Sequence, residues 1–248
     1  MPEANTRRLV VQGLFASILM GLAGCGNGID NTAISPGDFS SDNDPISGSS
    51  DSTKKNSLAL QPDGSPKLED LMKPGPLGEK SIGSDSAAVT IIEYASLTCP
   101  YCRAFHQQTW PILKRDYIDK GKVKFILREF PIGHASGAAT IAMRCLGQNN
   151  SARFFELYHK FITQQNKWVS LEVRRDKIFS VATQTGISRK DFDTCYENKE
   201  ILEGLKWVKQ RARDLGVSGT PTFFVNGKKA RSVLTIDEII KMAAPLLS

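Results

Sequence analysis

The hydrophobic pattern in the middle of the chain predicts a strand, a helix and a second strand. Val89 to Ala95 is an apolar run typical of a strand buried on both faces, and Val123 to Phe130 is a second one that stops at Pro131. Tyr101 to Lys120 between them predicts a helix interrupted at Pro111. Strand, helix and strand in this order imply a parallel pair with a right-handed crossover, and therefore an α/β fold.

After the second strand, the apolar period changes to that of helices. Apolar residues recur every three or four positions, which predicts five helices in a row: Ala138 to Leu146, Ala152 to Gln165, Glu172 to Thr185, Ser188 to Asn198 and Ile201 to Leu215. About seventy residues of helix therefore separate two parts of one sheet.

Strand character returns near the end of the chain. Pro221 to Val225 is predicted to be a strand, and Asn226-Gly227 indicates a type I′ hairpin turn into Lys228 to Val233. Thr235 to Glu238 has the pattern of a capping box, which predicts a closing helix. The expected order is sheet, inserted helices, sheet and final helix.

The N-terminus has the pattern of an export signal. Two arginines precede an apolar stretch from Leu9 to Leu22, which is too short for an ordinary membrane span. Small residues directly before Cys25 are typical of a bacterial lipoprotein signal. This predicts removal of residues 1–24 and a lipid on Cys25, although a plain signal peptide with an incidental cysteine is the alternative.

The next segment, residues 25–70, is rich in Ser, Asp, Asn, Gly and Pro, and is expected to be a disordered tether. The folded domain is expected at 71–248, with the helical insertion at about 135–215.

From Lys67 to Ser248, 28 Lys and Arg outnumber 19 Asp and Glu. A basic body can rest on an anionic membrane or favour acidic clients, but a basic surface without a dedicated partner is equally open. No basic run carries interleaved aromatics, so nucleic acid is not an expected partner.

The sequence Cys99-Pro100-Tyr101-Cys102 stands between the first strand and its helix. Two cysteines at this spacing can open and close a disulfide while the helix N-terminus stabilises a thiolate. A zinc site would need a second such pair or two histidines at ligand spacing, and neither is present, so no metal is expected.

Within the motif, Cys99 is expected to be the nucleophile and Cys102, one turn further along, the resolving cysteine. Glu93 lies six residues before Cys99 in the strand. Buried there, its carboxyl would exchange a proton with Cys102, whereas a partly solvated glutamate near a strand end is the alternative. His106, one turn further along the helix, could modulate the active site, but it is interpreted as an ordinary surface histidine.

Two further cysteines, Cys145 and Cys195, fall on predicted inserted helices. They are either buried small hydrophobic residues or a disulfide that holds the insertion together. Export to an oxidising compartment favours the disulfide.

Together with Gly219-Thr220-Pro221-Thr222, these motifs resemble the DsbA-type thiol-disulfide oxidoreductases, which have a thioredoxin fold with an inserted α-helical domain. The resemblance covers about residues 76–245. It implies that Pro221 is cis and faces the CxxC motif, and that Thr220 presents its backbone to an extended client peptide beside Pro100 and Tyr101. A trans proline that opens an edge strand is the alternative.

The chain departs from that family in two ways. Pro100-Tyr101 is glutaredoxin-like where many members have a histidine in second place, so Cys99 is expected to be less acidic than in those relatives. The pair Cys145 and Cys195 is absent from the simplest members.

The resemblance implies an extracytoplasmic oxidase that passes the Cys99–Cys102 disulfide to secreted proteins as they fold, and the lipoprotein pattern at Cys25 predicts that it is tethered to a bacterial membrane. It further implies reoxidation by a DsbB-like, quinone-linked membrane protein, a monomeric state, and no metal or dissociable cofactor. Two other interpretations stay open: a reductase or isomerase kept reduced by a membrane electron donor, and a non-catalytic holdase.

Overall fold

The computed structural model describes residues 60–230 and 234–247. The predicted signal segment 1–24, Cys25 and the tether up to residue 59 lie outside the described residues.

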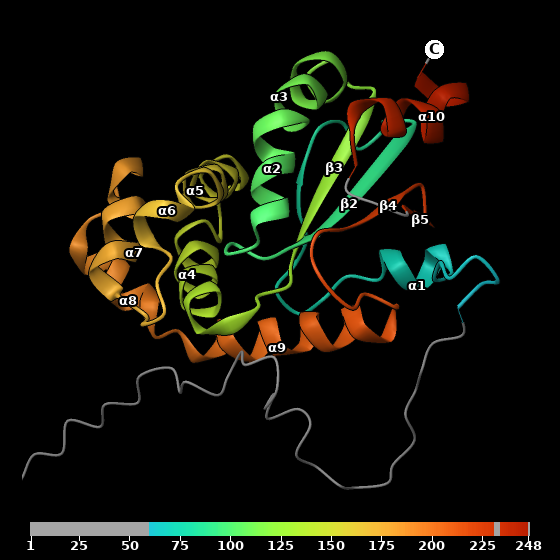
Figure 1. Cartoon of the computed structure of the whole chain (residues 1–248). Helices are drawn as coiled ribbons and strands as arrows, with labels where there is room; N and C mark the ends of the chain where they lie inside the picture. Colours follow the sequence, from blue (N-terminus) through green and yellow to red (C-terminus); the bar gives the residue numbers. More distant parts are fainter. Residues whose placement is uncertain (1–59, 231–233, 248) are drawn as a thin grey trace, which may run out of the picture. The chain divides into compact units, whose positions relative to one another are not determined.

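The strands are β1 (Lys80–Ile82), β2 (Val89–Ala95), β3 (Val123–Glu129), β4 (Thr222–Val225) and β5 (Lys228–Lys229). The helices are α1 (Leu68–Met72), α2 (Pro100–Gln108), α3 (Trp110–Leu113), α4 (Gly133–Leu146), α5 (Ser151–Thr163), α6 (Gln165–Trp168), α7 (Arg175–Ala182), α8 (Arg189–Tyr196), α9 (Lys199–Asp214) and α10 (Ile236–Leu247), with a π-helical turn η2 (Lys114–Ile118) and a 3₁₀ turn η3 (Thr183–Thr185) (Figure 1).

The five strands form one mixed sheet in the order β1-β3-β2-β4-β5. The predicted parallel pairing of β2 with β3 is confirmed, with Ile91 opposite Phe125. β4 pairs antiparallel with β2, which places the late part of the chain beside the first long strand. β1 was not predicted, because a strand of three residues is too short to show a period; it pairs antiparallel with β3.

Helices cover both faces of the sheet. Alternate residues of β2, Ile91 among them, join the core on the side of α2, α3 and α10. The neighbouring Ile92 and Tyr94 join the core on the other side, with Leu71 of α1 and Leu215 after α9. Strands buried on both faces read as continuous apolar runs, and this explains the pattern of β2.

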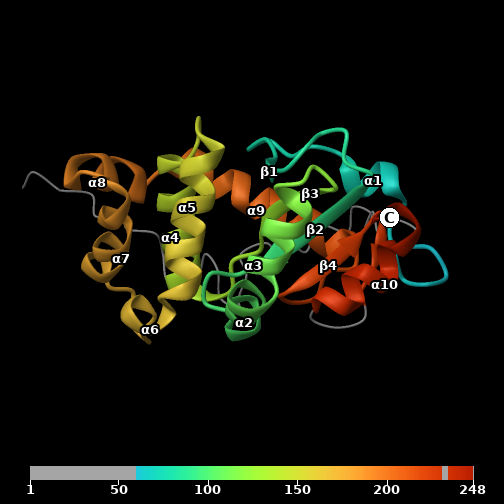
Figure 2. The ribbon, with the colours of Figure 1, turned by 90° about the horizontal axis from the view of Figure 1, so that it is seen from above.

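The inserted helices α4 to α8 form a group beside the sheet, and α9 runs from that group to beneath the strands (Figures 1 and 2). The predicted helical segments are confirmed with shifts of a few residues, except that α6 is a separate helix. Phe154, Leu157 and Phe161 of α5 belong to the same hydrophobic cluster as residues of α2. The insertion and the sheet therefore share a core.

The described chain already packs on the sheet before residue 71, where the tether was expected to end. Ser65 is buried, and its hydroxyl accepts a hydrogen bond from the Lys229 backbone N–H at 2.9 Å.

Near the end of the chain, Asn226 and Gly227 have φ of 47° and 85°, as the predicted hairpin turn requires. No helix in the described ranges is long and apolar enough to cross a membrane.

Candidate active site

Cys99 begins the helix that follows the first long strand. It is the N-cap residue of α2, with extended φ and ψ of −73° and 121°, and Pro100 occupies the first turn, where its missing N–H is not needed. The backbone N–H of Cys102 points at Cys99 Sγ over 3.5 Å. The sulfur therefore stands where unpaired N–H groups and the helix dipole favour negative charge.

The two thiols of the motif differ strongly in acidity. The pKa of Cys99 is lowered to about 6, and the largest cause is a hydrogen bond from the Cys102 side chain. Other hydrogen bonds, including those from the backbone N–H groups of Cys102 and Tyr101, lower this pKa further, whereas burial raises it. Cys102 is fully buried, and this burial is the main reason why its pKa lies well above the usual value. Both cysteines are free thiols in the structure. The arrangement gives one acidic, partly exposed thiol and one buried thiol with a raised pKa.

The second motif lies directly against the first. The Thr220–Pro221 peptide bond is cis, and the Thr220 carbonyl accepts a hydrogen bond from Cys99 Sγ over 3.1 Å. Tyr101 is 64% exposed beside the reactive sulfur. The structure thus brings together two segments that are about 120 residues apart in the sequence. The first carries Cys99, Pro100 and Tyr101, and the second carries Thr220 and Pro221.

Glu93 is fully buried, and its charge acts on Cys102. It sits between Leu127 of β3 and Phe223 of β4 in the sheet register. Its Oε2 is 2.8 Å from Nε2 of His106. The alternative of a partly solvated glutamate is therefore wrong.

His106 is only 2% exposed, so its interpretation as a surface histidine is also wrong. It follows Cys102 by four residues, and residues four apart lie on the same face of a helix. The burial of Cys102 was thus a signal that His106 points inward. The physical reason for the error is that a histidine was taken as polar and exposed, whereas here its ring packs between Tyr158 and Trp110.

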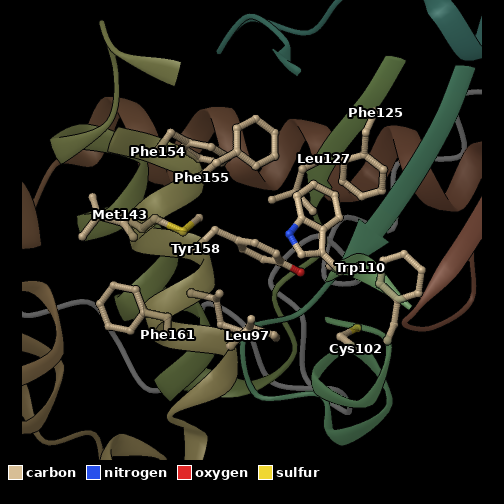
Figure 3. Close-up of a cluster of buried hydrophobic side chains, with 14 of the residues drawn as sticks. Leu97, Cys102, Trp110, Phe125, Leu127, Met143, Phe154, Phe155, Tyr158 and Phe161 are labelled. Atoms are coloured by element: carbon tan, nitrogen blue, oxygen red, sulfur yellow. The ribbon is translucent and has the colours of Figure 1, made fainter. Parts of the chain in front are cut away.

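Tyr158 of α5 closes this buried region from the insertion. Figure 3 shows its ring reaching toward Trp110, with the hydroxyl end on the side of the cluster where Cys102 lies. The ring stands edge-on to His106 at 4.8 Å between centroids. Burial, followed by the charge of Glu93, raises the pKa of Tyr158 well above its usual value, so the phenol stays protonated.

Gln165, the first residue of α6, was not predicted as a site residue. It is 5% exposed, and its Nε2 donates hydrogen bonds to the carbonyls of Leu97 at 2.8 Å and Cys99 at 2.9 Å. The inserted helices thus hold the loop that carries Cys99. Nothing in the local sequence distinguishes this glutamine from its neighbour Gln164, because the contact joins segments 66 residues apart.

The cysteines of the insertion form the predicted disulfide, Cys145–Cys195, with a Cα–Cα distance of 5.4 Å. It joins α4 to α8. Among the described residues, no group of three or more His, Cys, Asp or Glu side chains is arranged to hold a metal ion.

Comparison with known proteins agrees with this geometry. Residues 77–242 match the family model described as Thioredoxin. A Rickettsia typhi protein with the provisional name protein-disulfide oxidoreductase is 33% identical over 159 residues, which are 64% of this chain and 58% of that protein. A Bacillus cereus protein with the provisional name disulfide bond formation protein D is 30% identical over 155 residues, 61% of this chain and 72% of that protein. The chain spans little more than half the length of the Rickettsia relative.

Solved structures show the same fold. The crystal structure of α-DsbA1 from Wolbachia pipientis superposes with a TM-score of 0.66 at 25% identity, covering 73% of this chain and 96% of that one. BdbD from Bacillus subtilis, in its oxidised form, gives 0.63 at 22% identity over 74% and 96%. The chain belongs to the thioredoxin family, among its DsbA-type protein-disulfide oxidoreductases.

Proposed function

We propose that this protein is an extracytoplasmic oxidase that transfers the Cys99–Cys102 disulfide to proteins folding outside the cytoplasm. The observation that carries the proposal is the asymmetry of the two thiols. Cys99 has a pKa of about 6 at a helix N-terminus, whereas Cys102 is buried with a raised pKa. A stabilised thiolate favours the reduced form of the pair, so the corresponding disulfide is a good oxidant.

The transfer begins when a client thiolate attacks Cys99 Sγ in the disulfide form. The Cys99–Cys102 bond breaks, a mixed disulfide forms between client and Cys99, and Cys102 leaves with the electron pair and takes up a proton. A second client thiolate then attacks the client sulfur of the mixed disulfide and releases Cys99 as a thiolate. Two electrons pass from the client dithiol to the cysteine pair.

The surface around Cys99 suits an extended client peptide. Thr220 and Pro221 precede β4, and their backbone lies beside the reactive sulfur. We expect the Thr220 backbone to pair with the client while Pro100 and Tyr101 contact its side chains. Such pairing reads the shape of a peptide backbone and little of its sequence, as an enzyme with many clients requires.

Glu93 is proposed to exchange the proton of Cys102. Its buried carboxyl raises the pKa of Cys102 through charge repulsion, which adds to the larger effect of burial. A carboxyl within reach of a leaving thiolate acts as a general acid in one direction and as a general base in the other.

The setting of the enzyme is proposed from the sequence outside the described residues. We propose that residues 1–24 are a lipoprotein signal, that Cys25 carries the lipid and that the segment up to residue 59 links it to the domain. Replacing Cys25 by Ser should release the protein from bacterial membranes without changing disulfide transfer by the purified protein. A Cys25→Ser protein that still fractionates wholly with membranes would place the anchor elsewhere.

The proposed partners follow from the same function: folding proteins with free cysteines as clients, and a DsbB-like, quinone-linked membrane protein that reoxidises a monomeric enzyme. No dissociable cofactor is needed, because the cysteine pair itself carries the electrons.

The decisive experiment measures the equilibrium of the cysteine pair with glutathione, together with oxidation of a reduced, unfolded client. An oxidase should have a reduction potential well above the value of about −270 mV of thioredoxin, and should restore activity to the client. A potential near that of thioredoxin, with reduction of client disulfides, would assign the protein to the reductases. Suppression of client aggregation by a Cys99→Ser variant, without any thiol exchange by the native protein, would indicate a holdase.

A further inference from the structure

A cluster of buried polar side chains lies behind Cys102 and includes more than the glutamate discussed above. Glu93, His106 and Tyr158 are each at most 2% exposed. Three of their polar atoms, Glu93 Oε1, His106 Nδ1 and the Tyr158 hydroxyl, have no hydrogen-bond partner among the described residues. Buried polar atoms are nearly always paired in stable proteins, so three together need an explanation in function.

The pairing within the cluster is one-sided. His106 Nε2 lies 2.8 Å from Glu93 Oε2, within hydrogen-bond distance. The other oxygen, Oε1, is buried and has no hydrogen-bond partner in the part of the chain that the structure describes. Titratable groups that act on the cluster come from every element around it: Glu93 of β2, Cys99 at the start of α2, Cys102 and His106 of α2, Tyr158 and His159 of α5, and Glu129 of β3.

We propose that His106 is a positioning residue that holds Glu93 Oε2 and shares a proton with it, so that Glu93 Oε1 gives one proton to Cys102 and later takes it back. This inference rests on the proposed dithiol exchange and adds His106 to its machinery. The chemical reason is the choice of a histidine: a lysine or arginine would keep a permanent positive charge beside the carboxylate, whereas an imidazole can hold or release a proton near neutral pH.

The proton balance closes over one cycle. In the disulfide form the pair holds one extra proton, as a carboxylic acid beside a neutral imidazole or as a carboxylate beside an imidazolium. When a thiolate attacks Cys99, the S–S bond breaks, Cys102 leaves with the bonding electrons, and that proton moves to its sulfur. When the disulfide forms again, Cys102 returns the proton to the pair as its sulfur attacks. No proton has to cross the buried region to solvent.

The energetics explain why the pair is needed. A thiolate left on Cys102 would be buried without a compensating charge, which is strongly unfavourable. Burial already raises the pKa of this thiol well above its usual value. A proton available within the cluster therefore removes the main obstacle to Cys102 as a leaving group.

The test measures the rate at which reduced glutathione opens the disulfide of the full protein between pH 5 and 8, in the native protein and in His106 variants. His106→Phe keeps an aromatic ring between Trp110 and Tyr158 but cannot hold the carboxyl. We expect its rate at pH 7 to fall about tenfold and its pH profile to shift by about one unit. His106→Gln keeps an N–H donor toward Oε2 but cannot hold the shared proton. We therefore expect its rate at pH 7 to fall by only about threefold, while its pH profile stays shifted as in His106→Phe.

The control is Gln164→Leu at the end of α5, because this side chain bonds to Gln184 at the surface and should leave the rate and the pH profile unchanged. The alkylation midpoint of Cys99 should stay near 6 in every variant, because His106 acts on Cys102. A folded His106→Phe protein with the native rate and pH profile would overturn the inference. Equal losses in His106→Phe and His106→Gln, or the same loss in the control, would overturn it as well.

A second measurement needs no variant. In the native protein labelled with ¹⁵N-histidine, the His106 nitrogen resonances should differ between the oxidised and reduced forms at one pH, while those of His134 stay constant. Unchanged His106 resonances would show that neither the imidazole nor the carboxyl that it contacts changes protonation, and would overturn the inference. Failure to oxidise a protein client would remove the proposed function instead, since the glutathione and resonance measurements do not depend on a client.

Discussion

The two cysteine pairs of this protein have the same chemistry but occupy opposite ends of helices. Cys99 stands at the N-cap of α2. Cys145 and Cys195 each lie one residue before the end of their helices, α4 and α8. The helix dipole stabilises a thiolate at the N-terminal end and destabilises one at the C-terminal end. The first pair is therefore placed to exchange and the second to remain bonded.

The surroundings of the two pairs reinforce this difference. Cys99 is half-buried, in contact with the Thr220 carbonyl and next to the exposed Tyr101. The disulfide of the insertion closes a separation of 50 residues between two helices. A long closed loop restricts the unfolded chain, which is how a disulfide stabilises a protein without any reactivity. The comparison teaches that position on a helix, more than the presence of a disulfide, separates catalytic from structural cysteines.

The largest expected effect comes from removing the reactive thiol. Cys99→Ser should lower the rate of client oxidation by at least about 1,000-fold, because a hydroxyl cannot form the mixed disulfide. The measurement is recovery of activity by a reduced, unfolded client with glutathione disulfide as terminal oxidant. Its control is the double variant Cys145→Ser/Cys195→Ser, which should keep the rate within about threefold at a temperature where it is folded. A large loss in the double variant would mean that the second pair also exchanges.

The second effect concerns stability and falls on the other pair. Cys145→Ser/Cys195→Ser should lower the free energy of unfolding by about 2–4 kcal/mol, as loss of a disulfide that closes a long loop predicts. Urea denaturation of the native and variant proteins, both with the Cys99–Cys102 pair reduced, measures this difference. A change in the free energy of unfolding below about 0.5 kcal/mol would mean that the disulfide does not stabilise the insertion.

Much of the scaffold was predictable because it is encoded locally. The apolar run of β2, the Asn226-Gly227 turn and the Thr235 capping box are short-range signals, and the structure reproduces each of them; in the last, the Glu238 backbone N–H donates to Thr235 Oγ1 at 3.3 Å. The CxxC motif and the downstream Thr-Pro motif were likewise visible in the sequence.

The missing parts of the site depend on contacts between distant segments. The exposure of His106 was misjudged because burial arises from α5 and β3, which pack over that face of α2. The role of Gln165 depends on a helix 66 residues away from the loop that it holds. Local periodicity carries no information about either contact.

The third effect is the pH dependence of the reactive cysteine. With a pKa of about 6, Cys99 should be alkylated by iodoacetamide about tenfold faster at pH 8 than at pH 5, with a midpoint near 6 and a plateau above pH 7. The sign follows from the lowered pKa, because the folded protein lowers the pKa of this thiol from 9.0 to about 6 and so favours the thiolate. This stabilisation of the thiolate is lost as the pH falls through about 6. Cys102 should stay unlabelled in the same experiment, because its pKa is raised and its sulfur is buried.

Mass spectrometry of the peptide that carries each cysteine separates the two signals. Cys145 and Cys195 should be unlabelled throughout, since they are joined in a disulfide. A midpoint for Cys99 near 9 would show that the helix N-terminus and its hydrogen bonds do not stabilise this thiolate.

The smallest expected effect tests whether the insertion supports the catalytic loop. Gln165→Leu keeps the size of the side chain but removes both hydrogen bonds, so the carbonyls of Leu97 and Cys99 lose their donor. Without these hydrogen bonds the loop that carries Cys99 can shift, and the cysteine then loses part of its orientation toward the client. We therefore expect client oxidation to slow by about fivefold. The neighbouring Gln164→Leu is the matched control, because that side chain bonds to Gln184 at the surface and should leave the rate unchanged. Equal rates for the two variants would mean that the inserted helices and the thioredoxin half contribute separately, the insertion to stability and the other half to exchange.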